Sequence, residues 1–102
     1  MAAIVNKDTF DSIILGEKPT LVDFYADWCG PCRMVAPTVE EIAAERTDIN
    51  VVKVNVDNSP ELAVRYGVSS IPTLIVFKGG EPKAKAVGVK TKAQLIDMID
   101  GK

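Results

Sequence analysis

Two cysteines separated by two residues, Cys29 and Cys32, are the side chains of this chain best suited to chemistry, and they are its only cysteines. A disulfide between them closes a very short loop, so it would stabilise the fold by only about 2 kcal/mol. Because the thiols are held close together, the second can attack a mixed disulfide formed by the first as an intramolecular step. The spacing therefore predicts a redox-active dithiol rather than a structural staple.

Two other uses of the cysteine pair compete with this prediction. A structural zinc site needs four Cys or His ligands, and the chain has two Cys and no His. The count excludes a complete Cys/His site within one chain and leaves open a zinc shared between two chains; we expect no metal. Two buried cysteines acting as small apolar side chains are the other alternative. Gly30 and Pro31 argue against it, because they mark a turn rather than a helix interior.

The composition predicts one globular domain over residues 1–102. Hydrophobic residues make up 47% and charged residues 25%, as in ordinary soluble proteins. The formal net charge is −2 and the lysines are scattered, so no basic surface indicates a nucleic-acid partner. No apolar run could span a membrane, and the N-terminus lacks the pattern of a signal peptide. We therefore expect a cytoplasmic protein, unless a targeting segment has been removed.

The cysteines lie between a predicted strand and a predicted helix. The apolar run Thr20–Ala26, interrupted only by Asp23, predicts a central strand covered by helices on both faces. Apolar residues then recur at helical spacing and predict a helix from about Pro31 to Arg46, with its start set by the proline. This junction places both thiols at the beginning of the helix.

The remaining segments continue the alternation and end in a hairpin and a helix. Before the strand at Thr20–Ala26 we expect a helix that is capped by Asn6 or Asp8 and runs to about Leu15. After the cysteine helix we expect a strand over Ile49–Asp57 and a helix from Ser59 to near Gly67. The chain should then form two strands, Thr73–Lys78 and Lys83–Val89, joined at Gly79–Gly80, and a last helix from the Thr91–Gln94 capping box to Ile99. The expected order is β-α-β-α-β-α-β-β-α, in which the first strand is not assigned to particular residues. It predicts an α/β fold with a central mixed sheet and helices on both faces.

Three motifs, Phe24–Cys32, Lys53–Asp57 and Ile71–Thr73, occur in an order and spacing that resemble the thioredoxin family. The resemblance extends from Phe10 to Gly88. It implies a thioredoxin fold and a thiol–disulfide oxidoreductase that reduces protein disulfides. It also implies disulfide-containing proteins as substrates and a thioredoxin reductase as the electron donor. We expect a monomer without a cofactor, since the chain lacks a Gly-rich dinucleotide fingerprint.

The roles of the two thiols follow from their positions relative to the expected helix. The sulfur of Cys29 can meet unpaired backbone N–H groups and the positive end of the helix dipole. Both favour the thiolate, which is the attacking species. Cys32 lies in the first turn and is expected to be more enclosed. We predict Cys29 as the nucleophile and Cys32 as the resolving thiol, with Gly30 and Pro31 contributing to the redox tuning.

Asp23 is an acid in an apolar strand, six residues before Cys29. Burial raises the pKa of a carboxylate, and a base poised in this way could take the proton from Cys32 through a water. An acid satisfied by a hydrogen bond or pointing to solvent is an equal alternative on the residues alone. The family resemblance implies the functional carboxylate. Lys53 faces the same region in that family, either pairing with Asp23 or lying along the strand as an ordinary surface lysine.

The resemblance also implies a substrate-docking surface beside the cysteines. It implies a cis bond before Pro72, where the backbone at Ile71 can pair with an extended segment of the substrate. The other residues that map onto this surface are Trp28, Gly30, Pro31, Val56, Val87, Gly88 and Val89. Tyr25 stands where many family members have Trp, and Arg33 stands where Lys is frequent.

Relatives with other activities differ between the cysteines. Oxidases and isomerases on this scaffold tend to carry a His there, and glutaredoxins usually carry Pro-Tyr. The Gly30–Pro31 pair is similar to the reducing branch. A second, non-catalytic role as a partner subunit stays open from the sequence.

Overall fold

The computed structural model describes residues 2–102, in which strands and helices alternate before a final hairpin and helix. In chain order the elements are β1 (Ala3–Ile4), α1 (Lys7–Ile14), β2 (Thr20–Tyr25), α2 (Gly30–Glu45), β3 (Asn50–Asn55), α3 (Pro60–Arg65), β4 (Thr73–Lys78), β5 (Glu81–Val87) and α4 (Lys92–Asp100). This order confirms the predicted β-α-β-α-β-α-β-β-α arrangement. The sequence pattern assigns no residues to the first strand.

The strands form one mixed sheet in the order β1-β3-β2-β4-β5. The central strand, β2, pairs in parallel with β3 and in antiparallel with β4. All six residues of β2 are buried, as the apolar run predicts for a strand covered on both faces. Strand β5 lies at an edge, with its lysines exposed, and such charges discourage pairing with another chain.

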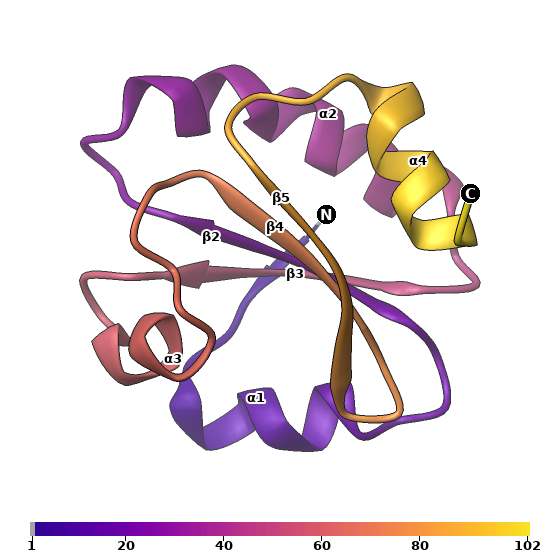
Figure 1. Cartoon of the computed structure of the whole chain (residues 1–102), viewed down its shortest axis with the longest axis horizontal. Coiled ribbons are helices and arrows are strands. Elements are labelled where there is room, and N and C mark those ends of the chain that lie inside the picture. The colour runs from indigo at the N-terminus through magenta and orange to yellow at the C-terminus, as the bar shows by residue number, and fades with distance from the viewer. Residues whose placement is uncertain (1) are drawn as a thin grey trace.

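Helices cover both faces of the sheet, with α1 and α3 on one side and α2 and α4 on the other (Figure 1). Each side has its own apolar core. On the α1–α3 side the core includes Phe10, Phe24, Leu62 and Phe77. On the α2–α4 side it includes the buried residues Leu21, Val35, Val39, Ile42, Leu74, Leu95 and Ile99. Neighbouring residues of β2 point to opposite sides, because side chains alternate along a strand.

Local sequence signals explain where most elements begin. Asn6 caps α1 and accepts a hydrogen bond from the Asp8 backbone at 2.9 Å, which decides between the two predicted caps. Thr91 and Gln94 form the expected capping box before α4. Helix α2 begins at Gly30, one residue before the predicted start at Pro31, and Cys29 is its N-cap.

Strand β2 ends one residue before the predicted Ala26, and two other predicted strands differ from their expected bounds by two residues at one end or both. The strand expected over Ile49–Asp57 is shorter, since β3 ends where a turn begins after Asn55. The strand expected over Lys83–Val89 runs from Glu81 to Val87. It begins earlier because Gly79 and Gly80, with φ of 61° and 83°, form a two-residue turn and pairing resumes at once. It ends earlier because a φ of 93° turns the chain away at Gly88.

Candidate active site

The cysteine pair lies at the junction of β2 and α2. Cys29 is the N-cap of α2, and its sulfur accepts a hydrogen bond from the backbone N–H of Cys32 at 3.1 Å. The two residues are joined as a disulfide, with Cα atoms 5.2 Å apart. The sulfur of Cys29 therefore contacts an otherwise unpaired N–H group of the helix start, which favours negative charge there.

The two cysteines are equally enclosed, and each is 4% exposed. The expectation that Cys32 is the more enclosed residue is therefore wrong for the disulfide form. The reason is the loop before β4, which covers Cys29 and places the carbonyl oxygen of Ile71 3.7 Å from its sulfur. The two cysteines differ in what they contact rather than in their exposure.

The loop before β4 and the end of β5 lie side by side near this sulfur. The Ile71–Pro72 bond is cis, as the family resemblance implies. The carbonyl of Pro72 accepts a hydrogen bond from the backbone N–H of Gly88 at 2.8 Å, and Val87 pairs with Thr73. These contacts bring Ile71, Val87 and Gly88 together beside the buried Pro72.

An exposed apolar surface surrounds the disulfide. Trp28 is 66% exposed, and Val87 and Val89 are also exposed. Val56 and Ile71 are half-buried and pack against the small cluster formed by the cysteines, Tyr25 and Ala26. A Cβ added to Gly30, between the two cysteines in the sequence, would meet nothing within 4 Å, so the space beside the Gly30 backbone is open. Apolar side chains exposed around an open site are typical of a surface that binds another molecule.

Asp23 is buried, at 1% exposure. Neither of its carboxylate oxygens has a hydrogen-bond partner among residues 2–102. Burial raises the pKa of Asp23 from 3.8 to about 6, with the charge of Lys53 lowering it and that of Glu40 raising it. Asp23 therefore does not face solvent, and it accepts no hydrogen bond from residues 2–102. The carboxylate is of the kind that can exchange a proton near neutral pH.

Lys53 lies directly across from Asp23 in the pairing of β2 with β3. Its ammonium does not form an ion pair with Asp23 in the described part of the chain. Instead the Nζ atom lies 4.4 Å from the centroid of the Tyr25 ring. The Lys53 charge influences Asp23 from a distance, while its direct contact is with an aromatic face.

Sequence reasoning missed Asp57 and Asn55 as parts of the site. The indole N–H of Trp28 donates to Asp57 Oδ2 at 2.8 Å, and the backbone N–H of Asp57 donates to Asn55 Oδ1 at 2.9 Å. A signal for this contact was available: β2 and β3 are parallel, so the loops that follow them meet at the same edge of the sheet. Asp57 thus fixes the orientation of an exposed tryptophan.

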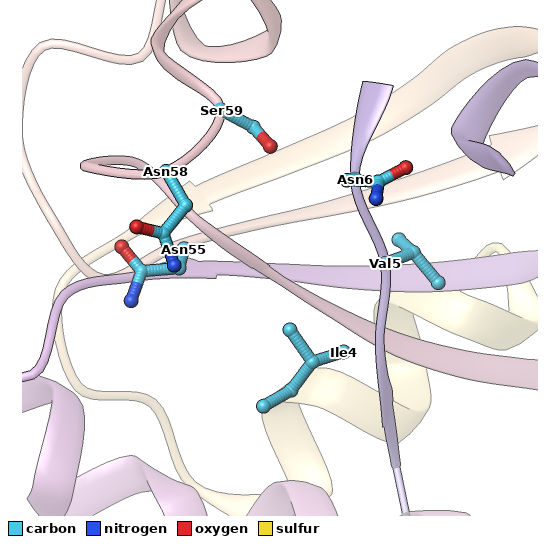
Figure 2. A pocket seen from close by; sticks show the side chains of 6 residues that line it. All are labelled: Ile4, Val5, Asn6, Asn55, Asn58 and Ser59. Atoms are coloured by element: carbon cyan, nitrogen blue, oxygen red, sulfur yellow. The ribbon is translucent and has the colours of Figure 1, made fainter. Parts of the chain in front are cut away.

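A separate cavity of about 290 Å³ lies between β1 and the loop that follows β3 (Figure 2). It is lined by Ile4, Val5, Asn6, Asn55, Asn58 and Ser59. None of the site residues predicted from the sequence lines it, and Asn55 is the one residue that it shares with the site described above.

Comparison with known proteins agrees with this geometry. The sequence profile of the thioredoxin family matches residues 1–101. The chain belongs to the thioredoxin family. It is 52% identical to a thioredoxin of Streptomyces clavuligerus over 93 residues, which cover 90% of this chain and 87% of the relative. It is 48% identical to a chloroplastic M-type thioredoxin of Chlamydomonas reinhardtii over 101 residues, covering 97% and 72%.

A solved structure has the same fold. A point mutant of a thioredoxin from Halobacterium salinarum superposes with a TM-score of 0.90 at 40% identity, covering 98% of this chain and 88% of that one. The fold is therefore the thioredoxin fold, as predicted. With Cys29 and Cys32 at disulfide distance, the chain is a thiol–disulfide oxidoreductase that reduces protein disulfides. Members of this family act with thioredoxin reductases and disulfide substrates. No helix within residues 2–102 has the length and apolar character needed to cross a membrane.

Proposed function

We propose that Cys29 attacks a protein disulfide and that Cys32 releases the reduced product. The Cys29 thiolate displaces one substrate sulfur, which leaves as a thiolate, and forms a mixed disulfide. The Cys32 thiolate then attacks Cys29, releases the second substrate sulfur and leaves the Cys29–Cys32 disulfide. Two electrons pass to the substrate. The observation that carries the proposal is the hydrogen bond from the first turn of α2 to the Cys29 sulfur.

Asp23 is the proposed proton acceptor for Cys32. A general base works best when its pKa lies near the operating pH, and the pKa of Asp23 is raised to about 6. Its carboxylate oxygens have no partner within residues 2–102 and so are not committed to a structural hydrogen bond. Lys53 modulates this carboxyl through its charge.

The surface around the disulfide is the proposed docking site for an extended segment of the substrate. The apolar contacts come from Trp28, Val56, Ile71, Pro72, Val87 and Val89, with Gly88 alongside. The backbone at Ile71 pairs with the substrate main chain. Gly30 and Pro31 tune the redox chemistry between the two thiols.

A thioredoxin reductase is the proposed source of electrons. We also propose that the chain is a single domain that acts as a monomer in the cytoplasm. The test is reduction of insulin with NADPH and a thioredoxin reductase, in parallel with glutathione as the only electron source. We expect turnover with the reductase and little with glutathione. Preference for glutathione would contradict the proposed donor. Sedimentation of the purified chain tests the monomer, and cell fractionation that separates cytosol from organelles tests the location.

The order of attack is tested with single-cysteine variants. Cys32→Ser should trap a mixed disulfide through Cys29, because the resolving thiol is gone. Cys29→Ser should trap little, since Cys32 lacks the contact with the helix start. Intact mass spectrometry after incubation with an oxidised protein substrate counts the trapped species. Equal trapping by both variants would overturn the assignment of the nucleophile.

A further inference from the structure

Four side chains from two adjacent strands share the α2–α4 side of the sheet near the disulfide. Asp23 and Tyr25 come from β2, and Lys53 and Asn55 come from β3, with Asp23 opposite Lys53 and Tyr25 opposite Asn55. Neighbouring strands of a sheet lie about 5 Å apart, so side chains at paired positions on one face are close neighbours. A lysine opposite a buried carboxylate would therefore be expected to form an ion pair with it.

The lysine turns to the aromatic ring instead. Lys53 Nζ lies 4.4 Å from the Tyr25 ring centroid, well within the reach of a cation–π contact. The ring is largely buried, at 9% exposure, so its face is fixed by packing. The oxygens of Asp23, two residues before Tyr25 on the same strand, accept no hydrogen bond from residues 2–102.

The other charged groups near Asp23 give the ammonium no competing partner within residues 2–102. Glu40 lies on α2, which packs on this side, and its charge acts on Asp23. The Glu40 Oε1 atom accepts a hydrogen bond from the Ala2 backbone at 2.7 Å. Asp27 acts on the Tyr25 hydroxyl, and Cys32 on α2 carries no proton in the disulfide form. The direct contact of the ammonium is thus the aromatic ring.

We propose that Tyr25 is a positioning residue, whose ring holds the Lys53 ammonium away from the Asp23 carboxylate and so preserves a carboxyl able to exchange a proton. The inference rests on the proposed role of Asp23. If the ammonium paired with the carboxylate, it would stabilise the ionised form and make Asp23 a weaker base. The ring keeps the positive charge close enough to act on Asp23 without neutralising it.

The test is the titration of the Asp23 carboxyl in Tyr25→Leu, with Tyr25→Phe as the matched control. The carboxyl carbon of Asp23 is followed by NMR against pH in the oxidised protein, where neither cysteine titrates. Phenylalanine keeps the ring face, so its midpoint should stay near that of the wild type. Leucine releases the ammonium, and the midpoint should fall by about one pH unit or more. Equal midpoints in the two variants would overturn the proposal.

The Lys53→Met background separates charge from hydration. There the Tyr25→Leu change should leave the Asp23 midpoint unmoved, because no ammonium remains to be released. The same downward displacement with and without Lys53 would mean that the ring only excludes water from Asp23, and would also overturn the proposal.

A measurement on the wild type keeps the proposal testable if Tyr25→Leu does not fold. Protons over an aromatic face are shifted upfield, so the Lys53 Hε resonances should be upfield of those of the exposed Lys78. Unshifted Hε resonances would refute the contact. The titration reports on Asp23 whether or not Asp23 acts as a base. An unchanged rate in Asp23→Asn would therefore remove the base role and leave the positioning result standing.

Discussion

On the side of the sheet covered by α1 and α3, β2 contributes Val22 and Phe24, whereas at the active-site end of the other side it contributes Asp23 and Tyr25. All four residues are buried. The α1–α3 side holds aromatic rings packed edge to face, with the centroids of Phe10 and Phe77 5.5 Å apart. The other side holds a carboxylate without a hydrogen-bond partner in residues 2–102.

The comparison separates what stabilises this fold from what it uses for chemistry. Burying aromatic surface is favourable, and pairs in this geometry add to it. Burying an unpaired carboxylate is unfavourable. The α1–α3 side also buries an unpartnered polar atom, the Thr20 hydroxyl oxygen, but that group is neutral and costs far less than a charge. The apolar cores on both sides of the sheet, with the packed aromatic rings on the α1–α3 side, offset the cost of the reactive group.

The largest expected effect comes from breaking the aromatic side. Phe77→Ala removes a fully buried ring that contacts Phe10 and Tyr66. Such a truncation costs about 3–5 kcal/mol of unfolding free energy. Chemical denaturation measures that loss. Insulin reduction, assayed at a temperature where the variant is folded, should retain the wild-type rate per folded molecule. A folded Phe77→Ala protein with little activity would show that the two sides are not separable.

The opposite sign is expected on the other side. Asp23→Asn removes a carboxyl whose pKa rises from 3.8 to about 6 on folding, which corresponds to about 3 kcal/mol of unfolding free energy. Because the folded pKa is the higher one, wild-type stability falls as pH rises from about 4 to 6 and then levels off. The variant should therefore be more stable at pH 8, with the gain vanishing near pH 4.

Kinetics complete this test of Asp23. Release of the reduced product should slow in Asp23→Asn, since Cys32 loses its proton acceptor. Denaturation curves across the pH range and stopped-flow release of a trapped substrate measure the two effects separately. A variant that is less stable at pH 8 and releases product at the normal rate would assign Asp23 a structural role instead.

Features that lie within one helix or strand could be predicted from the sequence. Patterns that repeat along one element are visible without a structure, and the run in Thr73–Lys78 gave β4 its observed bounds. The cysteine spacing and the lone acid in β2 were visible for the same reason. The two-residue strand β1 was not located, because Ala3 and Ile4 are exposed and too few to show a period.

Contacts between distant elements could not be predicted. The Lys53 ammonium could lie toward Asp23 or along the strand, and the choice of the Tyr25 ring depends on side-chain directions that a pattern does not encode. The equal burial of the two cysteines depends on a loop 42 residues further along the chain from Cys29. Helix position alone therefore gave the wrong order of exposure.

The smallest expected effect on the unfolding free energy concerns a lysine on the α1–α3 side of the sheet. The ammonium of Lys85 in β5 donates to the carbonyl oxygens of Tyr66 and Gly67, at 3.4 and 3.2 Å, just after α3. Lys85 pairs with Ile75, on the side covered by α3. Basic side chains stabilise a helix end by bonding its last carbonyls, so Lys85→Met should lower the unfolding free energy by about 1 kcal/mol or less.

Lys83→Met is the matched control, since Lys83 lies on the same strand and its one ion pair within residues 2–102 is with the exposed Glu81. An exposed ion pair of this kind contributes little, so the control should unfold like the wild type. Thermal and chemical denaturation give the stability difference, and the Asp23 titration should be the same in both variants, because the contact lies across the sheet from the carboxyl. If the pH midpoint of the Asp23 titration changed in Lys85→Met, the two sides of the sheet would be coupled. A contact that stabilises the α1–α3 side would then also affect the reactive carboxyl on the other side.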